Sequence, residues 1–123
     1  MSATGESGVA DRVLIDTDVL VDHLRGVREI VFRPGLHYSL ITRCELFAGP
    51  ALHEGAVRNL LDGMSGIGIS PEVAELAGRI RRETSIATPD ALIAATALRH
   101  DLGLVSRNRR HFERVANLRL DSP

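Results

Sequence analysis

The amino-acid sequence predicts an α/β domain of three layers (α/β/α), in which helices cover both faces of a central, mostly parallel sheet of four to five strands. Short apolar runs alternate along the chain with stretches of helical periodicity, an order that favours right-handed crossovers between parallel strands. The run Val13-Leu14-Ile15 is continuously apolar, as in strands that are buried on both faces. A chain of 123 residues, 44% of them hydrophobic, has room for one core.

The first predicted strand spans residues 12–15 and ends at Asp16, where a carboxylate stops the apolar run. Apolar positions in residues 18–24 then repeat at helical spacing, and Gly26 follows as a helix stop. After the turn-forming pair Pro34-Gly35, residues 36–40 are strand-like. The chain therefore begins with a strand, a helix and a second strand.

Two helices are predicted next. Thr42 and Glu45 stand three residues apart, the spacing of a capping box in which each side chain satisfies a backbone N–H at the start of a helix. We expect this helix to end near Gly49-Pro50. The following helix is expected over residues 53–62, with Gly63 as its stop.

The second half opens with a weak strand over residues 66–69. Ser70 and Pro71 then supply an N-cap and a proline at the first helical position. The helix that they open has one apolar face and an outer face of arginines, formed by Val73, Leu76, Ala77 and Ile80 and by Arg79, Arg81 and Arg82.

The C-terminal third repeats the cap-plus-proline pattern at Thr88-Pro89. Residues 90–100 form a helix that is apolar almost all round and should be buried. A strand over 104–106, a basic loop over 107–111 and a last strand over 118–120 complete the prediction. Ligand sites in such sheets lie beyond the carboxyl ends of the strands, which is where Asp16 and the loop after Ser106 fall.

We expect a single domain over residues 11–121, preceded by a flexible N-terminal tail, residues 1–10, without the features of a secretory signal. No apolar run approaches the roughly 20 residues of a membrane span, so we expect a cytoplasmic protein without membrane contact. Cys44 has no partner for an internal disulfide, and we interpret it as core filler.

Charge narrows the possible functions. The net charge is −1, so nucleic-acid binding would have to use local patches. All 15 basic residues are arginines, which excludes a catalytic lysine and favours bidentate contacts to phosphate. Aromatic residues make up 3% of the chain, too few for the stacking platforms of single-strand-binding modules.

Three acidic residues stand where apolar packing does not explain them: Asp16 at a strand end, Glu45 in an apolar helix and Asp90 at the start of a buried helix. Asp90 could simply favour the positive end of its helix, and Glu45 could serve only the capping box. Asp18 and Asp22 are interpreted as a helix cap and a solvated helix face. Asp16 differs, because a carboxylate directly after a buried strand must be hydrated, paired or bound to a metal.

A hard divalent cation would explain all three acids together. Carboxylates that lie close together repel one another unless a cation neutralises them, and Mg²⁺ or Mn²⁺ prefers oxygen ligands. Such a cation activates a bound water for in-line attack and stabilises charge on a phosphodiester. This chemistry needs neither a lysine nor a covalent nucleophile.

Four sequence blocks carry a resemblance to a known family. In order along the chain they are Val13-Leu14-Ile15-Asp16-Thr17-Asp18-Val19-Leu20-Val21-Asp22, Thr42-Arg43-Cys44-Glu45-Leu46-Phe47-Ala48-Gly49, Asp90-Ala91-Leu92-Ile93-Ala94-Ala95-Thr96-Ala97 and Leu104-Val105-Ser106-Arg107-Asn108. From Arg12 onward the chain resembles the VapC-type toxins of the PIN-domain family. The resemblance implies a PIN-like fold and a Mg²⁺-dependent endoribonuclease, for which Mn²⁺ can substitute. It also implies a cognate VapB-like antitoxin, an RNA substrate (tRNA, rRNA or mRNA), and assembly as a homodimer and a toxin–antitoxin hetero-oligomer.

Matched residue by residue, the family's acidic quartet falls on Asp16, Glu45, Asp90 and Asn108, with Asp16 and Asp90 as the metal-holding carboxylates. Asn108 departs from the pattern, since many relatives have aspartate there. His111 stands where an acidic residue is frequent, so a second metal is not expected to bind firmly. Ser106 replaces a common threonine and keeps the hydroxyl. The segment before Leu36 is short for the family.

Arg107, Arg109 and Arg110 surround Asn108 and could clamp RNA phosphates, although a solvated basic turn explains them equally well. The five histidines lack zinc-ligand spacing and are expected in surface or cap roles.

Two alternatives remain open from the residues. The segment Asp16-Thr17-Asp18 also resembles the first motif of haloacid-dehalogenase-type phosphatases, but these and response-regulator receivers normally use a lysine, which this chain lacks. The other alternative is a catalytically weak binding module of the same fold that acts only through its antitoxin partner.

Overall fold

A five-stranded parallel sheet forms the centre of the computed structural model, which describes residues 12–123. The predicted tail over residues 1–10 lies outside the described residues. The strand order is β3-β2-β1-β4-β5, and every neighbouring pair is parallel. The strands are β1 (Val13–Ile15), β2 (Leu36–Ser39), β3 (Ser65–Ile67), β4 (Gly103–Val105) and β5 (Leu120–Asp121).

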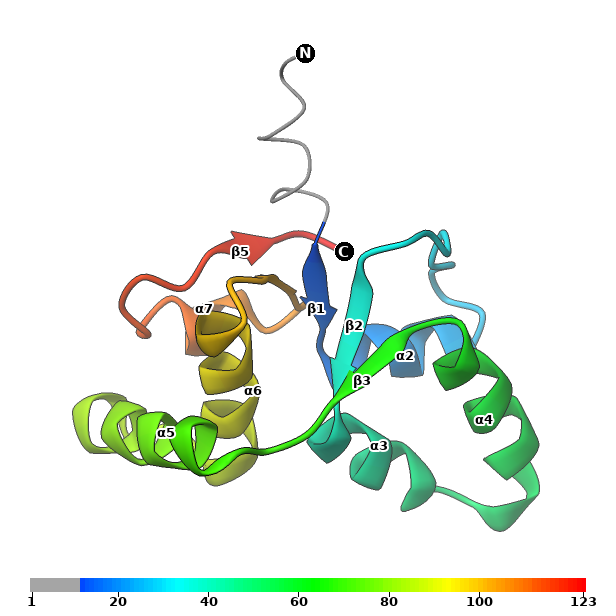
Figure 1. The fold of residues 1–123 in the computed structure, drawn as a ribbon. Coiled ribbons are helices and arrows are strands. Elements are labelled where there is room, and N and C mark those ends of the chain that lie inside the picture. Colours follow the sequence, from blue (N-terminus) through cyan, green and yellow to red (C-terminus); the bar gives the residue numbers. More distant parts are fainter. Residues whose placement is uncertain (1–11) are drawn as a thin grey trace.

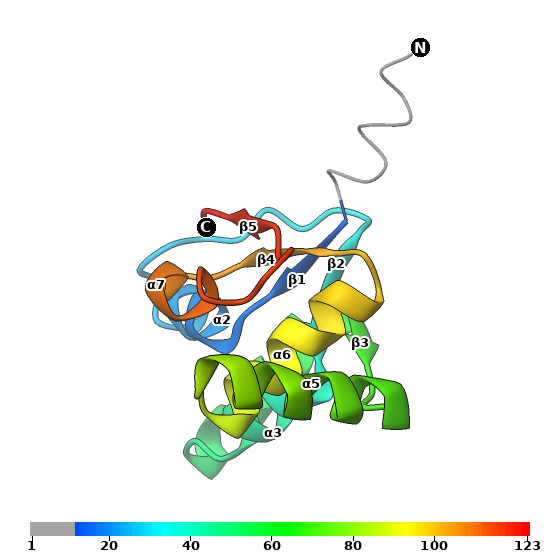
Figure 2. The ribbon, with the colours of Figure 1, turned by 90° about the vertical axis from the view of Figure 1, so that its left-hand side faces the viewer.

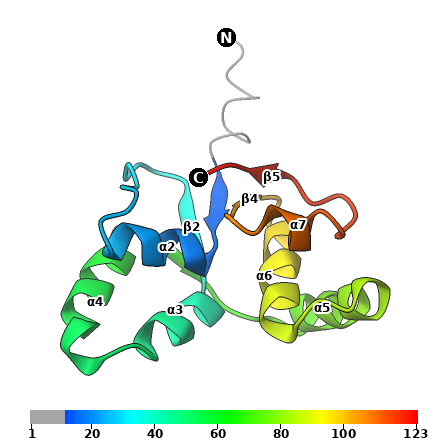
Figure 3. The same cartoon turned by 180° about the vertical axis from the view of Figure 1, so that it is seen from behind.

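Helices cover both faces of this sheet, as Figures 1 and 3 show from opposite sides. Helices α5 and α6 lie on one side, and Figure 2 views the molecule from there; α2, α3 and α4 lie on the other side. The three-layer α/β prediction is confirmed, with a sheet that is parallel throughout. The helices are α2 (Thr17–Leu24), α3 (Leu40–Phe47), the 3₁₀ turn η1 (Ala51–His53), α4 (Glu54–Asp62), α5 (Pro71–Thr84), α6 (Thr88–Arg99) and α7 (Arg109–Phe112).

The alternation of side chains along β1 divides the core in two. Leu14 packs into a cluster with buried residues of α5 and α6. Its neighbours Val13 and Ile15 point the other way, into a cluster with residues of α2, α3 and α4. All three β1 side chains are buried, as expected for the middle strand of a sheet covered on both faces. None of the helices in residues 12–123 combines the length and apolar character that a membrane span requires.

The direction in which successive strands are added to the sheet reverses at β1. The chain leaves β1 for β2 on one side, and later returns to β4 on the other side. Ligand sites in open α/β sheets lie beyond the carboxyl ends of the strands at such a point. Ile15 is paired with Val105 in the register of β1 and β4, so the residues that follow, Asp16 and Ser106, leave the sheet side by side.

The structure corrects two predicted helix starts. Helix α2 begins at Thr17 with Asp16 as its N-cap, so Asp18 lies in the first turn and is not the cap. Helix α3 begins at Leu40 with Ser39 as its N-cap, and the predicted capping box is wrong. Ser39 ends strand β2, and its hydroxyl accepts a hydrogen bond from the Ile41 N–H, so the N-cap lies three residues before Thr42.

Further corrections concern the C-terminal half and the cysteine. Helix α6 starts at Thr88 after Ala87, whose side chain makes no cap bond, so Thr88 is not the N-cap. Part of the predicted basic loop is the single-turn helix α7. Cys44 is exposed on α3 and does not fill the core, because the buried face of that helix is formed by Thr42 and Leu46.

Candidate active site

Three hydrogen bonds hold Asp16 at the carboxyl end of β1, two of them with residues at the end of β4 and one with the first residue of α2. Its backbone N–H donates to the Val105 carbonyl at 2.9 Å, which extends the β1–β4 pairing by one residue. The Ser106 hydroxyl donates to Asp16 Oδ2 at 2.7 Å, and the Thr17 N–H donates to Oδ1 at 2.8 Å. One carboxylate therefore caps α2 and joins β1 to the loop after β4.

Burial makes the charge of Asp16 unfavourable. The residue is 6% exposed, and this burial raises its pKa from the ordinary 3.8 to about 6. The hydrogen bond from Ser106 and that from Thr17 lower the pKa, but the negative charges of Asp18 and Asp90 raise it further. No arginine within residues 12–123 forms an ion pair with Asp16. A positive charge brought to this carboxylate would therefore be stabilising.

Glu45 reaches the same edge from α3. Its Oε1 accepts a hydrogen bond from the Thr17 hydroxyl at 2.6 Å, and that hydroxyl lies 2.9 Å from the buried hydroxyl of Thr42. The Thr17 hydroxyl thus fixes the direction of an otherwise exposed carboxylate. Thr17 directly follows Asp16, so the first turn of α2 orients two of the predicted acids.

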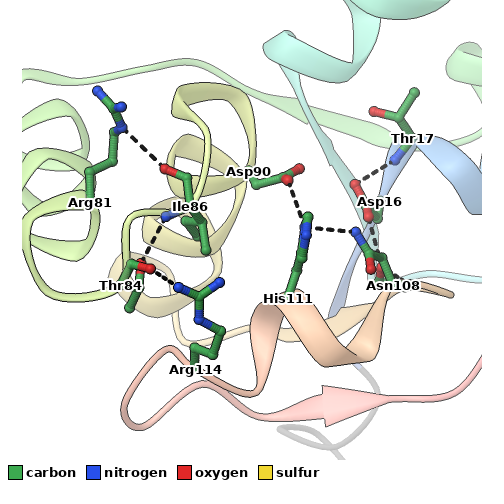
Figure 4. Close-up of polar contacts among 10 residues, drawn as sticks. Asp16, Thr17, Arg81, Thr84, Ile86, Asp90, Asn108, His111 and Arg114 are labelled. Carbon is green, nitrogen blue, oxygen red and sulfur yellow. Dashed lines mark hydrogen bonds and ion pairs between the residues drawn. The ribbon is translucent and has the colours of Figure 1, made fainter.

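Asp90 lies in the first turn of α6, where the positive end of the helix favours a carboxylate. Its Oδ2 is 3.3 Å from His111 Nδ1, and the same nitrogen is 2.9 Å from the side-chain amide of Asn108. Figure 4 shows these three side chains in a row that leads toward Asp16. The Asn108 N–H donates to the Ser106 hydroxyl at 2.9 Å, and that hydroxyl donates to Asp16, so backbone and side-chain hydrogen bonds join Asn108 to Asp16.

A surface pocket of about 350 Å³ brings the predicted residues together. All four positions of the proposed quartet line it, and so does Arg107. The complete lining is Asp16, Thr17, Asp18, Val21, Glu45, Asp90, Arg107 and Asn108. A larger hollow of about 440 Å³ lies beyond β3, but Glu72 is its single acidic residue, so the predicted chemistry belongs to the smaller pocket.

Arg107 is not a free basic side chain. Its Nε lies 2.9 Å from Asp22 Oδ2 and 3.9 Å from Asp18 Oδ2, and its side chain is 54% exposed. Asp22 is 8% exposed, so the prediction that it lies on a solvated helix face is wrong. Its carboxylate is instead paired with Arg107, which lies 85 positions further along the chain. Arg107 therefore anchors the loop after β4 to α2, while its exposed part borders the pocket.

The other two predicted phosphate contacts lie at the start of α7. Arg110 is exposed, and Arg109 is half-buried. Asp18 completes the acidic lining: burial raises its pKa above the ordinary value, and its Oδ1 is buried without a hydrogen-bond partner among the described residues. The lining of the pocket thus combines four carboxylates with one arginine, Arg107, while Arg109 and Arg110 follow Asn108 along the chain.

The donors at this pocket fit a hard cation. Asp16, Asp90 and Glu45 offer carboxylate oxygens, and Asp18 adds an unpartnered one. Within residues 12–123, no three acidic, histidine or cysteine side chains are close enough to enclose a metal ion by themselves. Mg²⁺ is usually bound by one or two carboxylates and keeps several waters, so two direct ligands are sufficient.

Sequence reasoning missed three contacts at the site, between Thr17 and Glu45, between Arg107 and Asp22, and between His111 and Asp90. Thr17 follows Asp16 directly, and its hydroxyl next to a candidate catalytic acid was the feature of the sequence that could have indicated its hydrogen bond to Glu45. The partners of Asp22 and His111 come from distant segments, Arg107 and Asp90, and had no local signal. His111 is exposed, as expected for the histidines, but it contacts one of the predicted acids.

Comparisons with known proteins agree on one family. The family model described as "PIN domain" matches residues 13–118. The chain is 32% identical over 119 residues to "Ribonuclease VapC19" of Mycobacterium tuberculosis (strain CDC 1551 / Oshkosh), an alignment that covers 85% of this chain and 95% of that protein.

Solved structures agree with this match. A toxin–antitoxin complex from Klebsiella pneumoniae contains a chain that superposes with a TM-score of 0.73 at 34% identity, covering 81% of this chain and 89% of that one. A chain in the DNA-bound VapBC complex from Salmonella typhimurium superposes with a TM-score of 0.82 at 22% identity, covering 90% and 97%. At that lower identity the likeness concerns the fold alone.

Proposed function

Because this chain belongs to the PIN domain family and is a VapC-type member of it, we propose that it is the toxin of a VapBC-type pair and hydrolyses RNA phosphodiester bonds with a divalent cation. The observation that carries the proposal is the buried carboxylate of Asp16, which faces further acids across one pocket and has no positively charged partner in residues 12–123. An anionic site of this kind is explained by a cation that offsets its charge.

Asp16 and Asp90 would hold Mg²⁺, and Mn²⁺ could replace it. When bound, the cation supplies an activated water and stabilises the negative charge that develops on the phosphate. Ser106 and the Thr17 N–H keep the Asp16 carboxylate in one orientation. Asn108, the uncharged member of the quartet, contributes through its contacts to Ser106 and His111.

Glu45 would accept a proton from the attacking water. One of its oxygens is held by the Thr17 hydroxyl, so the carboxylate has a fixed direction at the border of the pocket. A general base must lie within hydrogen-bond reach of the proton that it removes, and a fixed direction favours this. Arg109 and Arg110 would contact RNA phosphates beside the acidic centre, with the exposed part of Arg107.

The proposed partners are a cognate VapB-like antitoxin and the RNA substrate, in a cytoplasmic complex that also contains a second copy of this chain. The antitoxin-bearing complexes among the structural neighbours support this assembly. An antitoxin would keep the nuclease inactive until it is removed.

Expression of the free chain tests the function. We expect growth inhibition that co-expression of the cognate antitoxin reverses, and fragmentation of cellular RNA in the inhibited cells. An exposed control, Asp62→Asn, should remain inhibitory. Antitoxin binding without growth inhibition or RNA fragmentation would instead identify an inert binding module, and hydrolysis of p-nitrophenyl phosphate with intact RNA would identify a phosphatase.

A further inference from the structure

His111 brings a nitrogen donor to an edge of the site that otherwise offers oxygen donors. The residue lies on α7, and its side chain is 50% exposed. Its Nδ1 is 3.3 Å from Asp90 Oδ2 and 2.9 Å from the Asn108 amide. Figure 4 shows the ring between these two side chains, with Nδ1 directed at both.

The distance between the two donors suits a shared cation. Donors at right angles, each about 2.1 Å from an octahedral metal ion, are about 3 Å apart. The observed 3.3 Å between Asp90 Oδ2 and His111 Nδ1 differs from this by a small opening of the angle. Both side chains are accessible, at 27% and 50% exposure, so water can complete the coordination.

Asn108 can take part without a change of backbone. The two ends of a side-chain amide differ little in shape, so a half-turn exchanges the amide nitrogen that now faces His111 for the carbonyl oxygen. This would add a neutral oxygen donor 2.9 Å from the imidazole nitrogen, again close to the spacing of adjacent ligands.

We propose that His111 and Asp90 together ligate a divalent cation, and that the imidazole makes this site prefer a first-row transition ion such as Mn²⁺ over Mg²⁺. Mn²⁺ binds imidazole more weakly than the later first-row ions do, but Mg²⁺ gains still less from a nitrogen donor, so an imidazole ligand shifts the preference of the site toward Mn²⁺. The inference rests on the proposed function only in requiring a cation at this pocket.

Pulsed electron paramagnetic resonance of the Mn²⁺-loaded full-length protein tests direct ligation. We expect ¹⁴N coupling from a coordinated imidazole in the wild type, and loss of this coupling in His111→Gln. His100→Ala, which removes an exposed histidine at the opposite end of α6 from Asp90, should keep it. A hydrogen bond between His111 and Asp90 without ligation would give no such coupling.

Calorimetric titrations provide a second readout that does not depend on catalysis. His111→Gln should weaken Mn²⁺ binding about tenfold, the scale seen when groups around a metal are removed, and change Mg²⁺ binding less than threefold. His111→Asp should raise the affinity for Mg²⁺ relative to Mn²⁺. Mn²⁺ binding with no nitrogen coupling, or an unchanged Mn²⁺ to Mg²⁺ preference in His111→Gln, would overturn the ligand role and leave the proposed nuclease intact. Absence of any cation binding to the wild type would overturn both.

Discussion

Replacing Asp16 with asparagine is expected to stabilise the cation-free protein at neutral and alkaline pH. Burial raises the pKa of this carboxyl from 3.8 to about 6, so the folded state favours its neutral form. Each unit of pKa corresponds to about 1.4 kcal/mol, so ionised Asp16 should destabilise the fold by roughly 3 kcal/mol above neutral pH. Asparagine removes this charge and remains a good N-cap for α2.

The pH dependence determines at which pH the variant should be more stable than the wild type. At pH 4, Asp16 is protonated in the folded state and about half protonated in the unfolded chain, so the variant should come close to the wild type in stability. Between pH 4 and pH 6 the unfolded chain loses the proton first, so the stability of the wild type declines as the pH rises through about 6. At pH 8 the Asp16→Asn variant should have a free energy of unfolding roughly 1–3 kcal/mol above that of the wild type, which corresponds to about 4–10 °C in melting temperature for a domain of this size.

Thermal unfolding followed by circular dichroism from pH 4 to pH 8, with chelator present, measures this difference. The control is Asp62→Asn on the exposed end of α4, which should leave the melting temperature nearly unchanged. Added Mg²⁺ should then stabilise the wild type and leave Asp16→Asn unaffected, since a ligand stabilises only the state that binds it. A variant that is less stable than the wild type at pH 8, or a difference that persists at pH 4, would refute the role given to burial.

Two further variants test the anchoring of the site and the packing of the sheet. Arg107→Ala leaves the buried Asp22 carboxylate without its ion pair and should lower the free energy of unfolding, measured by urea denaturation, by about 1–3 kcal/mol. The exposed Arg110→Ala should change that free energy by less than about 0.5 kcal/mol, and equal effects of the two variants would contradict the anchoring role of Arg107. Gly66→Ala would place a Cβ 2.9 Å from the Tyr38 ring between β2 and β3 and should cost about 1–3 kcal/mol in the same assay; a neutral outcome would show that the strands can separate there.

The sequence predicted the parts of the fold that depend on local pattern. The apolar run at β1, the stop at Asp16 and the Ser70-Pro71 start of α5 are all as expected, because strand burial and helix capping are local effects. Parallel pairing then brings the ends of β1 and β4 together, so the proximity of Asp16 and Ser106 also followed from the pattern.

Contacts between distant segments could not be predicted in this way. Helical spacing places Asp22 on α2, but its burial depends on where the loop after β4 puts Arg107. The α3 start was misjudged because Ser39 and Thr42 are both acceptable caps, and the position of the strand end decides between them. The contact of His111 with Asp90 requires the single turn of α7 to pack beside α6, which no periodicity in four residues can indicate.

Cleavage of RNA by the purified chain, freed of its antitoxin and titrated with Mg²⁺, tests the central claim most directly. We expect cleavage that rises with Mg²⁺ or Mn²⁺, stops with chelator, and falls by at least a hundredfold in Asp16→Asn and in Asp90→Asn, since a metal-held water supplies the attacking group. Asp62→Asn should cleave as the wild type does. Full activity in either active-site variant, or cleavage that continues in chelator, would contradict the assignment of Asp16 and Asp90 as the residues that hold the catalytic cation.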